Sequence, residues 1–360
     1  MTIKHKDELF NINITKPDKA LKSAIKDRWD TIAKPLDSLG EFENIFMKIG
    51  AASGNVRVEI APAYLVEMCA DNGIVEEGVS QCGSYVTGVV AEKMGMGKSL
   101  SFIAAAAENI SAVAVDVGID GDTPAGVKKR KVRYGTRNFA KEPALTEEEV
   151  IKAISVGIEE AGEISEMGGK ILLTGEMGIG NTTTSSAVSS AILGYPADKL
   201  TGRGAGLSDS ALQKKIRIID EAIERYGLLE IVDKKERAFK ALQCVGGLDI
   251  AGLCGLCIGG AVYGIPVILD GLIAQTAALC AESILPGVKD YLVSSHIGKE
   301  RGTKLISDAL GLFTVIDAEL ALGEGSGAVM LYSMLKVVDV IYKTGAGFDE
   351  MGVAKYERFE

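Results

Sequence analysis

The sequence predicts an α/β fold in which a mostly parallel, Rossmann-like sheet is covered by helices on both faces. The first observation is an alternation of short apolar runs with longer segments of helical periodicity along the chain. The second is the placement of the 43 glycines, most of which lie at the ends of apolar runs, where α/β loops turn. The third is size, because 360 residues with 47% hydrophobic side chains can bury a large core.

Both ends of the chain have a helical pattern and lack a strand pattern. Within the first 50 residues, apolar side chains recur at helical spacing in two series, which are separated by a break at residues 34–40. The segment that follows Gly323 shows no strand signal either. We therefore expect residues 1–50 and 323–360 to form a small helical lobe beside a large α/β domain of residues 51–322.

Five apolar runs between these ends are predicted strands, and long segments of helical periodicity separate them. Right-handed crossovers between successive strands give a parallel sheet. Each run is followed by small or polar residues, and ligands of open α/β sheets bind at those carboxyl ends. The predicted strands are 63–70, 110–117, 170–174, 265–270 and 291–294, and the main predicted helices are 146–167, 209–226 and 234–256.

Charge and hydropathy exclude two classes of partner. The formal net charge is −10, and no predicted helix carries a basic stripe, so we expect neither nucleic acid nor an anionic membrane as a partner. The one basic cluster, KKRKVR at residues 128–133, is interpreted as a solvated loop or strand edge. No run reaches the about 18 consecutive apolar residues of a membrane span, and no signal segment opens the chain. We expect a cytoplasmic protein.

Cysteine and histidine usage argues against a metal site. The six cysteines lie singly in apolar surroundings, and a cytosolic compartment keeps such thiols reduced. Cys254 and Cys257 form a CxxC pair, but this pair lies in an apolar helical segment and lacks a second pair at zinc spacing, so we interpret it as core packing. His5 and His296 are the only histidines in the sequence. We expect neither a metal nor a cofactor.

The stretch 170–187, KILLTGEMGIGNTTTSSA, carries the most position-specific pattern. An apolar strand leads into a glycine-dense turn and then into small, hydroxyl-bearing residues that open a helix, so backbone N–H groups can converge on an anion. Gly175, Gly180, Asn181 and Thr182 have P-loop spacing, with Asn181 where a P-loop has lysine. A triphosphate needs the charge of that lysine, whereas a single phosphate ester does not.

The turn therefore predicts a site for a phosphate monoester. Glu176 lies inside the turn and would repel a phosphate, so we expect its side chain to face a cationic or protic part of the ligand. One alternative is a tight strand-to-helix turn without a ligand, because a glycine-rich loop alone is weak evidence. A second alternative is a P-loop-like NTPase or kinase, against which the missing lysine argues.

The sequence resembles the nicotinate-nucleotide:dimethylbenzimidazole phosphoribosyltransferase family, which activates the lower ligand of cobamides. The resemblance covers nearly the whole chain, and its most specific part is TGEMGIGNTTTSSA at residues 174–187. Further matches follow one another in the order of the family: KPLDSLGEFE from 34, ADNGIVEEGVS from 70, VGGLDIAGLCG from 245, IPVILDG from 265, SHIGKERG from 295, LGEGSGA from 322 and FDEMGVA near the end.

The resemblance implies a transfer of 5-phosphoribosyl from nicotinate mononucleotide to an aromatic acceptor, with inversion at C1′ and release of nicotinate. It assigns the catalytic base to Glu324 and a second carboxylate to Glu176. Both carboxylates would stabilise an oxocarbenium-like ribosyl centre. The phosphate contacts that it implies are Gly178, Ile179, Gly180, Asn181, Gly204 and Lys215, with Gly271 and Ser295 as further candidates.

The acceptor side departs from the family pattern. Asn72 replaces the histidine of the family's ADHG motif, the family's SHRS motif is here 295–298 with sequence SHIG, and residues 84–87 also differ. We expect an acceptor pocket lined by Tyr85, Met94 and Met177, because thioethers fill irregular gaps against aromatic rings. A phenol such as p-cresol is therefore a live alternative to a benzimidazole as the acceptor.

The resemblance leaves the assembly open. The chain is expected to act as a homodimer or as a heterodimer with a paralogous subunit. A non-catalytic subunit of such a heteromer is the remaining alternative, against which the retention of Glu176 and Glu324 argues.

Overall fold

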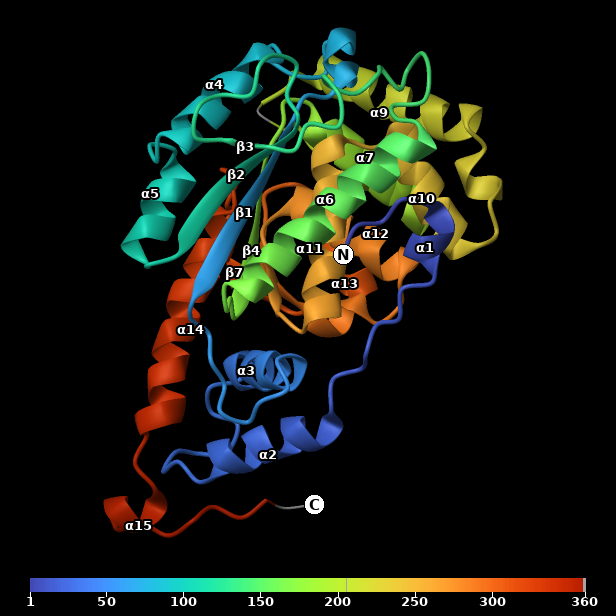
Figure 1. Ribbon diagram of the computed structural model, residues 1–360. Helices are drawn as coiled ribbons and strands as arrows, with labels where there is room; N and C mark the ends of the chain where they lie inside the picture. The colour runs from blue at the N-terminus through green and yellow to red at the C-terminus, as the bar shows by residue number, and fades with distance from the viewer. Residues whose placement is uncertain (205, 359–360) are drawn as a thin grey trace.

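A seven-stranded parallel sheet organises the chain (Figure 1). The computed structural model describes residues 1–204 and 206–358. The strands lie side by side in the order β3-β2-β1-β4-β5-β6-β7. Their bounds are β1 (Ala63–Ala70), β2 (Ser111–Gly118), β3 (Lys128–Lys129), β4 (Ile171–Met177), β5 (Val267–Leu269), β6 (Leu292–Ile297) and β7 (Thr314–Asp317).

All five predicted strands are present, and β4 is longer than predicted. It continues through Met177 because its later residues pair with β1, Glu67 opposite Gly175 and Cys69 opposite Met177. Gly175 and Glu176 are therefore strand residues, and the glycine-rich turn begins only at Gly178. Two edge strands were not predicted, since β3 and β7 have only two and four residues. β3 opens the basic cluster, which lies at the strand edge as expected. The expectation that the cluster is solvated is wrong, because Lys128 pairs with Glu160 at 2.7 Å and Lys131 with the buried Asp116 at 3.1 Å.

The helices follow the prediction with one correction. α6 (Glu147–Glu166) begins with a capping box between Thr146 and Glu149, and α9 (Asp209–Arg225) has its predicted bounds to within one residue. The prediction of one helix over 234–256 is wrong. The chain forms α10 (Lys234–Val245) and α11 (Leu248–Tyr263), separated by two glycines.

The break between α10 and α11 is needed for close packing at the carboxyl end of the sheet. A Cβ atom on Gly247 would lie 2.3 Å from Asp249 Oδ1 and 2.5 Å from Asn72 Oδ1. Asp249 thus enters α11 in its first turn, where its carboxyl group accepts a hydrogen bond of 2.9 Å from the Ile250 N–H. The break therefore brings an acid to the edge of the sheet where ligands bind.

Two apolar layers cover the sheet. On one face a continuous core joins the sheet to α6, α10, α11 and α12, and on the other a second core joins it to α3 and α14. In Figure 1 the first group lies to the right of the sheet, while α4, α5 and α14 lie to its left. The remaining helices are α1 (Lys6–Phe10), α2 (Lys19–Asp30), α3 (Glu41–Ala52), α4 (Tyr85–Gly95), α5 (Leu100–Ala107), α7 (Asn181–Leu193), α8 (Ala197–Leu200), α12 (Leu272–Ile284), α13 (Gly302–Leu310), α14 (Ser326–Thr344) and α15 (Phe348–Met351), with short 3₁₀ turns at Gly73–Glu77, Leu228–Glu230 and Val288–Tyr291.

The N-terminal helices α2 and α3 pack against the C-terminal part of α14. The ring of Trp29 lies 5.8 Å from that of Phe46 and 4.8 Å from that of Tyr342, so one aromatic cluster joins the two ends of the chain. This cluster continues into the core on the sheet through residues such as Leu173. α1 packs elsewhere, with the Phe10 ring 5.8 Å from Phe239 of α10. The division into a small lobe and a large domain stays a prediction, and residues 359–360 lie outside the described chain.

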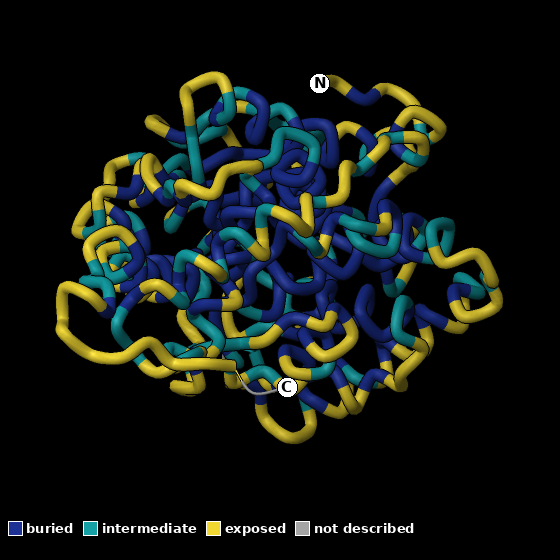
Figure 2. Tube along the Cα trace, turned by 90° about the horizontal axis from the view of Figure 1, so that it is seen from below, coloured by how far each residue is buried: buried dark blue, intermediate teal, exposed yellow. Residues whose placement is uncertain are grey.

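Most buried residues lie at the centre of the molecule, and the exposed ones lie on the outer loops and helix surfaces (Figure 2). Cys254 and Cys257 are buried in α11 as free thiols, as the core-packing interpretation requires. Cys82 is exposed, so the expectation of apolar surroundings is wrong for that residue. Among the described helices, none has the length and apolar character to cross a membrane.

Candidate active site

A cavity of about 290 Å³ opens at the carboxyl end of the sheet. It is bounded by the turns after β4, β5 and β6 and by the segment that precedes α14. Eight of the residues predicted for the site line this cavity: Glu176, Met177, Gly178, Ile179, Asn181, Gly204, Gly271 and Glu324. The topology therefore gathers residues that are up to 148 positions apart in sequence at one place.

The glycine-rich turn has a backbone that only glycine accommodates. Gly180 is the N-cap of α7 with φ 93°, in the left-handed region. A Cβ atom on Gly178 would lie 2.5 Å from the Ala70 carbonyl oxygen and 2.6 Å from Asp249 Oδ2. The turn thus places the N-terminus of α7 at the cavity, and a helix N-terminus favours an anion. The Ile179 N–H already donates to Thr87 Oγ1 at 3.0 Å, so a ligand must compete for it.

Lys215 lies directly behind this turn. Its side chain is fully buried, and its Nζ donates to Thr182 Oγ1 at 3.0 Å and to the Gly202 carbonyl oxygen at 3.4 Å. No carboxylate lies within ion-pair distance of Nζ among the residues that the structure describes. Burial lowers the pKa of Lys215 to about 8, while the charge of Glu300 opposes that shift. An unpaired buried cation beside a helix N-terminus suits an anionic ligand.

Asn181 joins two acids at the mouth of the turn. Its Nδ2 donates to Glu176 Oε2 and, at 3.1 Å, to Asp249 Oδ2. Burial raises the pKa of Glu176 to about 8, and the charge of Asp249 adds to this shift. Burial also raises the pKa of Asp249, to about 6, against the hydrogen bond from the Ile250 N–H. Glu176 is therefore a neutral acid at neutral pH in the free protein.

Glu324 is held in a backbone conformation that is unusual for its type. Its φ is 57°, in the left-handed region, and it lies between Gly323 and Gly325, which both have φ 80°. Ser101 Oγ donates to Glu324 Oε2 at 3.2 Å. Burial raises the pKa of the Glu324 carboxyl, and the bond from Ser101 opposes that rise.

Asp270 supports the turn that carries Glu324. Its carboxylate accepts hydrogen bonds from the N–H groups of Gly325 at 3.1 Å, Gly327 at 2.8 Å and Ala328 at 3.3 Å. These are the orphan donors at the start of α14, which an acidic side chain satisfies well. These hydrogen bonds hold the backbone that follows Glu324 in a fixed position.

Five predicted residues do not line the cavity. Gly180 shapes the turn from behind, and Lys215 reaches it only through Thr182. Ser295 Oγ instead forms a hydrogen bond of 2.9 Å with Nδ1 of His296, and it is His296 that lines the cavity. Met94 is buried, with its Sδ 4.0 Å from Cys69 Sγ, and belongs to the small core on which Met177 packs. Tyr85 is 75% exposed and borders a separate surface cavity.

The sequence reasoning missed four acids of the site, namely Glu67, Asp249, Asp270 and Glu300. Asp270 follows the apolar run of β5, and that position at the carboxyl end of a strand was a usable signal. Glu300 Oε1 accepts a hydrogen bond of 2.9 Å from the Gly204 N–H, a contact that joins loops 96 positions apart and leaves no local pattern. Glu67 lies inside an apolar strand, where the pattern predicts only core.

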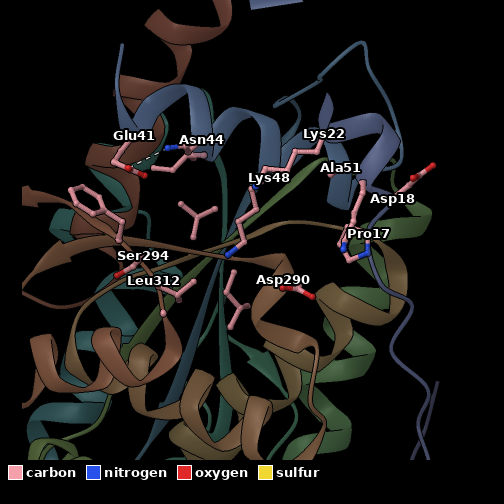
Figure 3. Close-up of a pocket in the computed structure, with 16 residues that line it drawn as sticks. Pro17, Asp18, Lys22, Glu41, Asn44, Lys48, Ala51, Asp290, Ser294 and Leu312 are labelled. Carbon is pink, nitrogen blue, oxygen red and sulfur yellow. Dashed lines mark hydrogen bonds between the residues drawn. The ribbon is translucent and has the colours of Figure 1, made fainter. Parts of the chain in front are cut away.

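A second cavity, of about 410 Å³, is shown in Figure 3 and shares no lining residue with this site. It is enclosed by α2, α3 and the first residues of β6, and Lys48 extends into it from α3. Ser294 borders this cavity, whereas His296, two residues later in β6, borders the first. None of the predicted site residues lines it, so we assign the chemistry to the cavity at the carboxyl end of the sheet.

Known proteins resemble this chain over nearly its whole length. The family model DBI_PRT, described as phosphoribosyltransferase, matches residues 14–353. A protein of Acetivibrio thermocellus named nicotinate-nucleotide–dimethylbenzimidazole phosphoribosyltransferase is 41% identical over 336 residues, which cover 92% of this chain and 94% of that protein. A protein of the same name from Clostridium acetobutylicum is 38% identical over 341 residues, or 94% and 96% of the two chains. The crystal structure of CobT from Thermus thermophilus matches with a TM-score of 0.88 and 34% identity, over 94% of this chain and 100% of that one.

Proposed function

This chain belongs to the nicotinate-nucleotide–dimethylbenzimidazole phosphoribosyltransferase family, and on that premise we propose that it transfers 5-phosphoribosyl from nicotinate mononucleotide to an aromatic base that serves as a cobamide lower ligand. The product is the α-ribotide of that base, and nicotinate is released. The acceptor is a benzimidazole or a phenol such as p-cresol.

One observation carries the proposal. Two carboxyl groups, those of Glu176 and Glu324, face the same 290 Å³ cavity as the N-terminus of α7. The helix terminus, with Lys215 behind it, suits the 5-phosphate of a mononucleotide. The carboxyl groups suit a ribosyl centre that develops positive charge and an acceptor that must lose a proton.

The bond changes at C1′ balance without a cofactor. The acceptor forms a bond to C1′ on the face opposite nicotinate, and the C1′–N bond breaks. Its electron pair goes to the ring nitrogen, so nicotinate leaves a pyridinium linkage as a neutral ring and needs no general acid. The acceptor's N–H or O–H proton passes to a carboxylate base.

The two carboxyl groups divide these tasks. Glu176, whose pKa burial raises to about 8, holds its proton at neutral pH and accepts a hydrogen bond from Asn181. Glu324 is half-buried, and Ser101 stabilises its charged form. We therefore assign the base to Glu324 and a hydrogen-bonding role toward the ribosyl group to Glu176.

The phosphate contacts are the N-terminal turn of α7, Asn181, Gly204 and Lys215. Lys215 Nζ lies 3.9 Å from where a Cβ atom of Gly204 would stand, so a larger residue there would crowd the cation. Glu300 holds the Gly204 N–H in the free protein. Phosphate binding would compete with this carboxylate, and Lys215 supplies the charge that favours the phosphate.

We place the acceptor against Met177, which is the one residue of the expected acceptor pocket that lines the cavity among the described residues. A thioether packs well against either a fused or a single aromatic ring. The P-loop alternative has less support, because Asn181 binds two acids at the position where a triphosphate would need a lysine.

A second copy of the chain is the partner that we propose for the exposed face of α14. Four apolar side chains at helical spacing are exposed there, and two from α5 lie on the neighbouring helix: Met330, Met334, Val337, Val340, Leu100 and Ile103. The charged residues beside them are paired within the chain, Lys336 with Glu108 at 3.0 Å and Lys343 with Asp339 at 2.8 Å. This face therefore carries little net charge to repel an identical copy.

Incubation with nicotinate mononucleotide and a panel of benzimidazoles, purines and phenols tests the proposed function. We expect nicotinate release together with an acceptor ribotide, identified by mass. Hydrolysis of ATP without any ribotide would instead favour the NTPase alternative, and no product with any acceptor would favour the non-catalytic subunit.

A further inference from the structure

Glu67 is a buried acid that the proposed reaction does not use. It lies on β1 at the centre of the sheet and is fully buried. Neither of its carboxyl oxygens has a hydrogen-bond partner, and within the described residues no lysine, arginine or histidine forms an ion pair with it. An ionised carboxylate without a partner is strongly unfavourable in such surroundings, so the group is expected to keep its proton.

The strand beside Glu67 is shaped around its side chain. Gly175 of β4 stands opposite Glu67 in the sheet. A Cβ atom on Gly175 would lie 2.5 Å from Glu67 Cγ and 3.1 Å from the backbone oxygen of Glu324. The absence of a side chain at Gly175 therefore leaves space for both the Glu67 side chain and the backbone of Glu324.

The groups that face Glu67 add negative charge. Glu324 precedes α14 and Asp270 follows β5, and their charges raise the pKa of Glu67 beyond the larger effect of burial. Glu176, on β4, acts in the same direction only when it is ionised. Burial raises the pKa of the Cys69 thiol, on the same strand, so this neighbour is neutral too. Ser101 of α5 lowers the pKa of Glu67, although its hydroxyl is not in hydrogen-bonding geometry with either carboxyl oxygen.

Ser101 connects Glu67 to the base. Its hydroxyl donates to Glu324 Oε2 at 3.2 Å and also lies close enough to Glu67 to affect its ionisation. The side chains of Glu67 and Glu324 thus share one polar neighbour under the cavity. A change of charge at Glu67 would therefore shift the pKa of Glu324, because the interaction acts over a short distance in a medium of low dielectric constant.

We propose that Glu67 is a positioning residue that remains a neutral carboxylic acid throughout the reaction, and that as a polar but uncharged neighbour it keeps Glu324 ionised and aimed at the acceptor. The proposal rests on the proposed function of Glu324 as base. Glu324 takes the acceptor's proton and returns it to solvent, while Glu67 neither gives nor receives a proton. The acid thus supplies polarity without adding a second charge.

Two substitutions separate polarity from charge. Glu67→Leu removes the polar neighbour, so Glu324 becomes harder to ionise, and the acidic limb of kcat/KM should move upward by about one pH unit, a loss of about tenfold on that limb. Glu67→Gln retains a neutral polar group and should return the acidic limb to its wild-type position.

The matched control is Glu43→Gln. Glu43 is also a buried acid, but it is paired with Lys34 at 2.7 Å in the N-terminal helices, far from the cavity. Its substitution should lower Tm and leave both limbs of the pH profile in place. This control separates the general effect of removing a buried carboxyl group from the specific effect of removing that of Glu67.

Thermal unfolding tests the protonation of Glu67 without any assay of activity. The folded protein keeps the proton to high pH, whereas the unfolded chain releases it in the usual range of a glutamate, so wild-type stability falls as pH rises. Glu67→Gln lacks this contribution, while that of Glu176 and Asp249 remains, so its Tm should exceed that of the wild type by an amount that grows with pH.

Each outcome decides the proposal. A Tm difference that stays constant with pH would show that Glu67 is not a neutral acid. A Glu67→Gln variant as inactive as Glu324→Gln would make Glu67 an ionised base, and a Glu67→Leu profile that superimposes on the wild type would remove it from the site. Failure of the wild-type chain to form any ribotide would overturn the proposed function instead, and would leave the unfolding test intact.

Discussion

The side-chain amide of Asn181 donates a hydrogen bond to the carboxyl group of Glu176, five residues earlier in the chain. The same Nδ2 donates to Asp249 at 3.1 Å. The residue that stands at the P-loop lysine position thus orients acids instead of offsetting phosphate charge. This relationship favours a site that combines one phosphate with carboxyl chemistry, and the tests below follow from it.

Glu324→Gln should lower kcat by about 10²–10⁴-fold, the usual contribution of a general base, because glutamine keeps the shape but cannot take the acceptor's proton. Binding of nicotinate mononucleotide should persist. If the acceptor is a phenol, with a pKa near 10, the loss should shrink as pH rises and phenolate forms in solution. Steady-state kinetics with a confirmed acceptor test this, and wild-type rates at neutral pH would transfer the base role to Glu176 or to water.

Lys215→Ala should weaken the binding of nicotinate mononucleotide by about 1.5–3 kcal/mol, the range for a hydrogen bond to a charged group. Lys214→Ala is the matched control, because Lys214 is a half-exposed neighbour whose Nζ reaches only Glu77. Calorimetric titration of both variants measures the effect. Equal affinities for the two would mean that Lys215 does not contact the phosphate.

Chelators should leave the transfer unaffected, and added Mg²⁺ should not stimulate it. Within the described chain no group of three or more histidine, cysteine, aspartate or glutamate side chains is arranged to hold a metal ion. The predicted phosphate site relies on a helix N-terminus and on Lys215. Rates measured with and without EDTA check this expectation, and a loss of activity that Mg²⁺ restores would contradict it.

Stability should fall as pH rises from about 5 to about 8. Burial raises the pKa of Glu176 to about 8 and that of Asp249 to about 6, so the folded state keeps protons that the unfolded chain releases near pH 4. The unfolded chain then binds fewer protons, and the free energy of unfolding decreases with pH. Tm should decline over this window, and Glu176→Gln should reduce the slope. A Tm that rises with pH over the same window would refute the assignment.

Val337→Glu should disrupt the proposed dimer. Val337 is 63% exposed on α14, at the middle of the apolar face, and a carboxylate buried there without a partner is costly. Lys234→Glu on α10, away from this face, is the control for an added carboxylate. Light scattering coupled to size exclusion gives the mass of each variant. A wild-type chain that is monomeric at all concentrations would contradict the proposed dimer.

The sequence predicted the site better where chemistry is local than where it depends on distant contacts. The turn at Gly178 and Gly180 could be recognised because closely spaced glycines, followed by hydroxyl residues, are a local signal of a tight turn before a helix. The end of β4 could not be recognised from the sequence, because glycine is a poor strand former and Gly175 is held in the strand by its pairing with Glu67. The break at Gly247 was missed for a similar reason, since part of the crowding there comes from Asn72, 175 residues away.

Glu67 shows most clearly what the sequence could not predict. A single acid inside the run AYLVEMCA carries no periodic signal, and only the folded sheet reveals that both of its oxygens lack partners beside Glu324. Tyr85 shows the converse, because a residue placed near the site by the family pattern lies on the surface of this chain.

The left-handed backbone of Glu324 has a consequence for how variants at this position should be interpreted. Such a conformation costs a side chain with a Cβ atom about 1 kcal/mol or more, and glycine escapes that cost. Folding alone would therefore select glycine at 324, between two other glycines, and catalysis alone would select glutamate. In a library randomised at this codon, selection for thermal tolerance and selection for turnover should enrich different residues. The difference in unfolding free energy between the two selected variants would measure how much conformational stability is lost by keeping glutamate, the proposed base, at this position.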